Sequence, residues 1–130
     1  MSIELLCLLV LALFLIVLAI VSTAFYGKQV GNPALRGNRE DIEPPMGAAR
    51  LAYRAHENLL ENLVPFTIVI LAAQLLHVST WLTQGAAVVF LLARVVHAPV
   101  YIAGVPVVRT IAWLTGVAAT FAIAIAVIMS

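Results

Sequence analysis

The sequence contains few charged residues. Charged residues make up 10% of the 130 residues, whereas hydrophobic residues make up 64%, and the mean hydropathy is +1.11. Soluble domains are about 45–50% apolar and about 25% charged, so a soluble fold of this length would expose much of its apolar surface to water. The composition therefore predicts a membrane protein, and the length allows a single domain over residues 1–130.

Several kinds of functional site are also missing. The single cysteine, Cys7, excludes an intramolecular disulfide, and its place in a long apolar run favours an inert thiol. The net charge is +1, and no basic run of the kind that binds nucleic-acid phosphates occurs. The three histidines are far apart or on different helices, and no Ser/His/Asp arrangement or glycine-rich phosphate loop is present. We therefore expect no metal site and no nucleic-acid partner.

Four apolar segments are long enough to span a membrane. A spanning helix needs about 20 mostly apolar residues, and the segments that qualify cover residues of about 3–26, 46–77, 81–102 and 107–129. A signal peptide is the alternative for the first segment, with residues 22–24 resembling a cleavage site. Its length, Glu4 and the lack of a basic start favour a retained membrane helix.

The connections between these segments predict their arrangement. The first connection is long and rich in glycine, asparagine and proline, whereas the second and third are short. Short connections make consecutive helices antiparallel neighbours, and backbone groups in a bilayer have to form hydrogen bonds within their own segment. The predicted fold class is therefore an all-α membrane protein, a four-transmembrane-helix up-down bundle.

All seven basic side chains gather at one face of this bundle. They lie in the first connection, at the start of the second helix, late in the third or at the start of the fourth: Lys28, Arg36, Arg39, Arg50, Arg54, Arg94 and Arg109. Cytoplasmic loops are enriched in Lys and Arg, so we expect this face to be cytoplasmic and both termini to lie on the opposite side. The compact form suggests a bacterial inner membrane.

Polar side chains form stripes on the predicted helices near the basic face. Their spacings of three, four or seven residues place each set on one helical face, and the sets are Arg54, Asn58 and Glu61; Arg94, His97 and Tyr101; and Arg109 with Thr110. Taken singly, these residues could be snorkelling arginines, an interfacial tyrosine and an interhelical histidine. Together they predict a basic pocket for a small carboxylate anion or a lipid headgroup.

The polar stripes also resemble a known family. Residues 54–66, RAHENLLENLVPF, resemble the signature R-A-x-x-N-x-x-E-x-x-x-P-F of the MAPEG family, the membrane-associated proteins in eicosanoid and glutathione metabolism. The spacing of Arg94, His97 and Tyr101 resembles the third helix of that family, and Arg109-Thr110 resembles the start of its fourth. The chain length and the four-helix plan agree over essentially the whole sequence.

The resemblance implies a homotrimer that binds glutathione as a co-substrate between neighbouring subunits, near the cytoplasmic face. Glu61 would meet the amino group of the tripeptide and arginines would meet its carboxylates, and the implied binding residues are Arg54, Asn58, Glu61, Arg94, His97, Tyr101 and Thr110. Arg109 and Lys28 are the implied catalytic residues. A cation near the thiol stabilises the thiolate, which is the nucleophile.

Two functions of different classes follow from the sequence. The first is a glutathione-dependent transferase or peroxidase that acts on a lipophilic electrophile arriving from the membrane, although no residue identifies the electrophile. The second is a non-catalytic membrane protein that uses the basic pocket to bind a lipid headgroup or small anion. A transporter is disfavoured because the sequence contains no inverted repeat.

Departures from the eicosanoid-forming members motivate the second function. Glu57 stands where the prostaglandin branch has Arg, and Asn62 stands where the leukotriene branch has Tyr. Trp113 stands where some members have Tyr, and Lys28 follows the first helix where an Arg is proposed to activate the thiol. These differences make the chain more similar to small bacterial members of the family.

Overall fold

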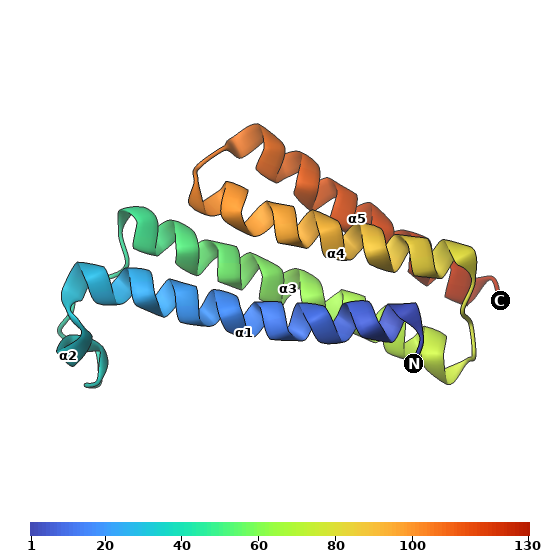
Figure 1. Cartoon of the computed structure of the whole chain (residues 1–130), viewed down its shortest axis with the longest axis horizontal. Helices are drawn as coiled ribbons and strands as arrows, with labels where there is room; N and C mark the ends of the chain where they lie inside the picture. Colours follow the sequence, from blue (N-terminus) through green and yellow to red (C-terminus); the bar gives the residue numbers. More distant parts are fainter.

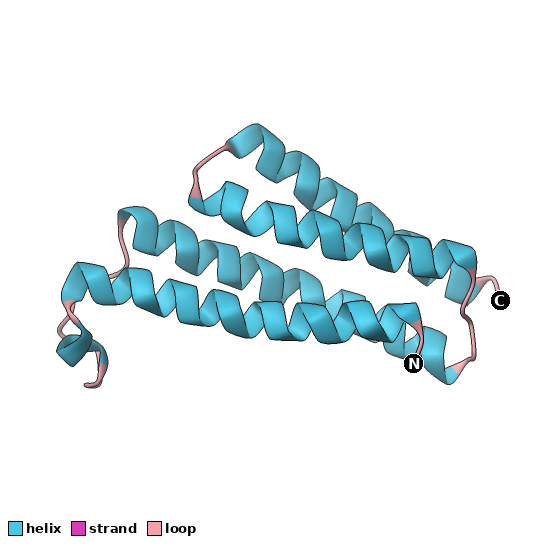
Figure 2. Ribbon diagram, viewed as in Figure 1, coloured by secondary structure: helices cyan, strands magenta, loops and turns pink.

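The computed structural model describes residues 1–130 and contains helices but no strands (Figure 2). The helices are α1 (Ile3–Val30), α2 (Asn32–Leu35), α3 (Gly47–Leu75), α4 (Trp81–Ile102) and α5 (Pro106–Ile128). All except α2 are long and apolar enough to cross a membrane. The predicted fold class, an all-α protein with four transmembrane helices, is confirmed.

The four long helices form two antiparallel pairs, α1 with α3 and α4 with α5 (Figure 1). The two pairs lie close together at the end that holds both chain termini and the turn between α3 and α4, and they separate toward the other end (Figure 1). We call these the terminal end and the basic end, because the basic residues lie toward the second. The residues of the predicted polar stripes lie on α3, α4 and α5 toward the basic end.

The core combines a stacked aromatic pair with aliphatic side chains and alanines. Phe66 of α3 and Phe90 of α4 stack with their ring centroids 3.8 Å apart and their planes 7° from parallel. Leu11, Ile70 and Ile123, from α1, α3 and α5, are completely buried in the same cluster. Many large apolar side chains face outward instead, which is the pattern expected where lipid is the solvent.

Two helix boundaries differ from the sequence expectation. Gly27 reads as a breaker after Tyr26, yet α1 continues to Val30 and Gly27 is a buried helical position. The helix ends at Gly31 instead, whose φ of 86° is readily adopted only by glycine. At the other end of the molecule, α3 ends at Leu75 rather than at His77, which has a positive φ of 56°.

Candidate functional site

A polar cavity of about 220 Å³ opens between α3, α4 and α5 toward the basic end. Five of the predicted site residues line it, together with one tryptophan: Asn58, His97, Tyr101, Arg109, Thr110 and Trp113. The lining therefore draws on α3 and on the consecutive helices α4 and α5. Its only charged member is a guanidinium, and no carboxylate borders the cavity.

Arg94 lies directly behind this lining. Its side chain is 1% exposed, and its Nη2 donates to Asn58 Oδ1 at 2.6 Å. The other two guanidinium nitrogens, Nε and Nη1, are buried without a hydrogen-bond partner. A buried charge without full pairing is unfavourable, so an anion close to Asn58 would stabilise this arrangement.

The Arg94 side chain packs beside a glycine of α5, Gly116. A Cβ added to Gly116 would lie 3.5 Å from Arg94 Cδ and 3.6 Å from the Phe90 ring. The arginine stem therefore lies beside the helix backbone and next to the stacked aromatic pair. Asn62 supports the same region by donating to the Asn58 backbone oxygen at 2.8 Å. These contacts hold Asn58 between Arg94 and the cavity.

His97, Tyr101 and Arg109 form the wall nearest the basic end. His97 is 1% exposed, its Nδ1 is buried without a partner, and its ring centroid lies 5.5 Å from that of Tyr101. Arg109 Cζ lies 4.6 Å from the Tyr101 ring centroid, a cation–π contact. The cavity thus has one cation behind its lining and a second within it.

A model of the MAPEG family matches residues 3–129, nearly the whole chain. The chain belongs to the MAPEG family. The resemblance read from the sequence is thereby confirmed, and it places the chain among proteins that include glutathione transferases and related enzymes. No curated protein matches this chain.

Besides Arg94, which lies behind the lining, three of the residues expected in the site of this MAPEG protein do not line the cavity. Arg54 and Glu61 are exposed on α3, and Lys28 is exposed near the end of α1, where its Nζ lies 5.7 Å from the Phe25 ring. At about 100° per residue, Asn58 lies about 60° around α3 from Glu61. This offset turns Asn58 toward α4 and leaves Arg54 and Glu61 facing outward.

The structure also shows residues whose positions the sequence did not indicate. Trp113 reads as an interfacial anchor, yet it lines the cavity. Glu4 reads only as an acidic residue at the helix start, yet it is completely buried at the terminal end and accepts a hydrogen bond from Thr83. The sequence feature that could have indicated this buried position is a carboxylate in the first turn of an otherwise apolar spanning helix. No three His, Cys, Asp or Glu side chains lie close enough together to hold a metal ion.

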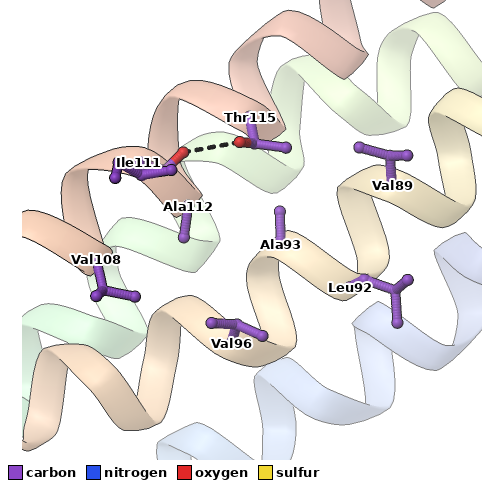
Figure 3. Close-up of a pocket in the computed structure, with 8 residues that line it drawn as sticks. All are labelled: Val89, Leu92, Ala93, Val96, Val108, Ile111, Ala112 and Thr115. Atoms are coloured by element: carbon purple, nitrogen blue, oxygen red, sulfur yellow. Dashed lines mark hydrogen bonds between the residues drawn. The ribbon is translucent and has the colours of Figure 1, made fainter.

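A larger, apolar cavity of about 320 Å³ lies between α4 and α5 of the MAPEG bundle (Figure 3). Seven of its eight lining residues are hydrophobic, and the short side chains of Ala93 and Ala112 project into the space between the two helices (Figure 3). The Thr115 hydroxyl donates to the Ile111 carbonyl at 2.8 Å and is unavailable as a donor. This surface suits an apolar chain and provides no means of recognising a polar ligand.

Proposed function

We propose that this MAPEG protein is a glutathione-dependent transferase or peroxidase that acts on lipophilic electrophiles in the membrane. The observation that carries the proposal is Arg94, a buried cation with two unpaired donor atoms beside an open polar cavity. Glutathione is a small anion with two carboxylates, which arginines bind well. Family membership supports glutathione as the co-substrate.

The proposed roles follow from the geometry of the lining. Arg109 meets a carboxylate or the sulfur from the wall of the cavity, where Tyr101 holds its guanidinium. Asn58 has its oxygen occupied by Arg94, so its amide N–H groups remain for the ligand. The Thr110 hydroxyl already donates to the Pro106 carbonyl at 2.9 Å, so it serves as an acceptor. In the transfer reaction, the thiol gives its proton to water, and a nearby cation favours the resulting thiolate. The thiolate then forms a bond to an electrophilic carbon of the substrate, while the leaving group departs from that carbon with the electron pair of the broken bond.

The exposed residues Arg54, Glu61 and Lys28 belong to the proposal through a homotrimer. A charged side chain within a spanning helix is costly in lipid, and Glu61 is exposed on α3 in the isolated chain. A neighbouring copy packed against α3 would shield these groups and bring them toward a shared ligand. In this assembly Glu61 meets the amino group of glutathione and Lys28 assists its thiolate.

We also propose that the basic end faces the cytoplasm of a bacterial inner membrane, with both termini on the opposite side. The concentration of Lys and Arg at that end supports this orientation. The cavity then opens toward the compartment that supplies glutathione, while the apolar substrate enters from the lipid.

A second candidate is a non-catalytic protein that binds a lipid headgroup or small anion in the same cavity. One observation favours it: the lining contains no carboxylate to meet an ammonium group. This candidate needs only the basic residues, whereas glutathione binding also requires an acceptor for its amino group.

Calorimetric titration of the detergent-purified protein with glutathione tests the proposal. Ophthalmic acid, which lacks the thiol, serves as the parallel ligand, and ultraviolet absorbance reports the thiolate. We expect saturable binding of both ligands, weakened in Arg109→Ala and Arg54→Ala and unchanged in Arg50→Ala, an exposed arginine outside the cavity. Absence of glutathione binding, with a phospholipid retained through Arg109, would instead support the second candidate.

A further inference from the structure

Asn62 is a polar side chain of α3 to which the proposed function assigns no role. It follows Asn58 by one helical turn, toward the middle of the membrane, and it is half-buried. It does not line the polar cavity. It borders instead an apolar cavity of about 310 Å³ between α3 and α5, together with Pro65, Val69, Val117, Thr120, Phe121 and Ala124. An amide in such surroundings is unfavourable unless its polar atoms have hydrogen-bond partners.

The partner of the Asn62 amide is Asn58. Asn62 Nδ2 donates to the Asn58 backbone oxygen at 2.8 Å, and this bond holds the same nitrogen 3.4 Å from Asn58 Oδ1. Arg94 Nη2 donates to that Oδ1 at 2.6 Å. Two donors, one from α3 and one from α4, therefore face the side-chain oxygen of Asn58.

These two donors determine which way the Asn58 side-chain amide is turned. An amide group has an acceptor oxygen on one side and a donor NH2 group on the other. Half a turn of the Asn58 amide would break its bond to Arg94 and place its NH2 group against both donors. The observed orientation leaves the NH2 group free to donate into the polar cavity that Asn58 lines.

Asn62 contributes to this orientation in a way that Arg94 does not. Arg94 has two further nitrogen atoms without a partner, so an anion in the cavity attracts the guanidinium and competes with Asn58 for it. The bond from Asn62 lies within one turn of α3 and depends neither on a ligand nor on the packing of α4. It therefore keeps the Asn58 amide oriented while Arg94 meets the anion.

We propose that Asn62 is a positioning residue of the glutathione site. It contacts Asn58 rather than the ligand, and it keeps the Asn58 N–H groups directed at acceptor atoms of glutathione. Without Asn62, the Asn58 oxygen can turn into the cavity, where it repels a carboxylate of the ligand. The inference rests on the proposed function, because it adds a residue to the same site.

A double-mutant cycle in glutathione binding tests this role. Calorimetry of the full-length, detergent-purified protein compares Asn62→Leu, Asn58→Ala and the double variant with the unmodified protein. We expect Asn62→Leu to weaken binding about fivefold and Asn58→Ala about tenfold, in the range of one hydrogen bond each. The double variant should bind as Asn58→Ala does, because Asn62 has nothing to position once the Asn58 side chain is absent.

Two further variants serve as controls for this cycle. Gln74→Leu removes an amide from the same helix at the terminal end, where it accepts from Ser2, and it should bind glutathione normally. Asn62→Ala should behave as Asn62→Leu does, which excludes an effect of the leucine side chain itself.

A second measurement needs no ligand. The NMR signals of the Asn58 side-chain NH2 group are identified by their absence from Asn58→Ala. We expect these signals to shift in Asn62→Leu and to keep their positions in Gln74→Leu, because only the first change removes a donor beside Asn58. Unmoved signals in Asn62→Leu would overturn the proposal.

The binding data distinguish this inference from the proposed function. A double variant weakened about fiftyfold, the product of the single losses, would overturn the inference, because Asn62 would then act independently of Asn58. Glutathione binding that depends on Asn58 and not on Asn62 would likewise overturn the inference and leave the proposed function standing. Absence of binding in the unmodified protein would overturn both.

Discussion

The two ends of the bundle differ in whether their buried polar groups have hydrogen-bond partners. At the terminal end, the buried carboxylate of Glu4 accepts hydrogen bonds from Thr83 at 2.7 Å and Ser79 at 3.0 Å. At the basic end, Arg94 and His97 are buried to the same degree, yet three of their nitrogen atoms have no partner. Buried polar groups are normally satisfied in folded proteins, so the exceptions beside the cavity indicate a binding role, whereas the satisfied cluster indicates a structural one.

The cluster at the terminal end connects three parts of the chain. Thr80 and Thr83 cap the start of α4 reciprocally, with the Thr80 amide donating to Thr83 Oγ1 at 2.9 Å. Glu4 therefore joins the first turn of α1 to the first turn of α4. Nearby, Ser2 donates to Gln74 of α3 at 3.0 Å. Neutral hydroxyls bind the carboxylate in place of a basic partner, and these hydrogen bonds attach the start of α1 to α3 and α4.

Removing the carboxylate gives the largest expected effect on stability. Glu4→Ala removes the acceptor of the Ser79 hydroxyl and the shorter of the two hydrogen bonds of the Thr83 hydroxyl, and it creates a small void, so we expect a loss of about 3 kcal/mol. Reversible denaturation in mixed micelles measures the change, and glutathione binding at the other end should be unaffected. Glu40→Ala removes an exposed carboxylate and serves as the control. A stability equal to that of the unmodified protein would show that the hydroxyl cluster contributes nothing to the fold.

Replacing the unpaired cation tests the other half of the comparison. Arg94→Met keeps much of the side-chain volume and removes a buried charge, and such replacements are often neutral or stabilising. We expect undiminished stability together with glutathione binding weakened roughly 30-fold, about 2 kcal/mol, as for a hydrogen bond to a charged group. Calorimetry and thermal denaturation of the same samples measure both quantities. A strong loss of stability would assign Arg94 a structural role and remove the contrast with Glu4.

The sequence predicted the spanning helices and brought together several residues that line the candidate cavity, because both depend on local patterns. Apolar runs define the helices, and residue spacing placed Asn58, His97 and Tyr101 on inward faces where the structure has them. The rotation of α3 depends on packing against its neighbours, so the outward positions of Arg54 and Glu61 were not predictable from spacing.

The hydrogen bonds around Glu4 were even less predictable from the sequence than the rotation of α3. Its partners Ser79 and Thr83 are 75 and 79 residues away along the chain. Only the folded arrangement of α1 against the start of α4 brings these groups together. Local periodicity reports which face of a helix is polar, and it carries no information about which distant hydroxyl meets that face.

A change in one hydroxyl distinguishes hydrogen bonding from packing at the terminal end. Thr83 is completely buried, and Thr83→Val keeps its shape while removing the hydroxyl that donates to Glu4 and accepts from the Thr80 amide. We expect a loss of about 1.5 kcal/mol, because a charged acceptor loses its shortest bond. Thr83→Ser retains the hydroxyl and should lose clearly less. Equal losses in the two variants would mean that the methyl group, rather than the hydrogen bond, stabilises this position.

The smallest expected effect comes from Gly116→Ala, at the point where α5 passes the Arg94 stem. The new Cβ would meet Arg94 Cδ at 3.5 Å and Phe90 at 3.6 Å, which are ordinary van der Waals distances. Alanine also favours a helix over glycine by up to about 1 kcal/mol, so we expect stability to rise by about 0.5 kcal/mol and glutathione binding to change less than about twofold. Thermal denaturation and calorimetry provide the measurements.

The value of this variant is that it crowds Arg94 without removing its charge. Gly37→Ala, a glycine in the first connection with no side chain within contact distance of a new Cβ, controls for the change of residue type. If Gly116→Ala weakened binding as strongly as Arg94→Met while stability rose, the position of the guanidinium as well as its charge would be needed at the cavity. The unpaired nitrogens of the basic end would then require a narrowly defined geometry, in contrast to the hydroxyls around Glu4, which can rotate to keep their bonds.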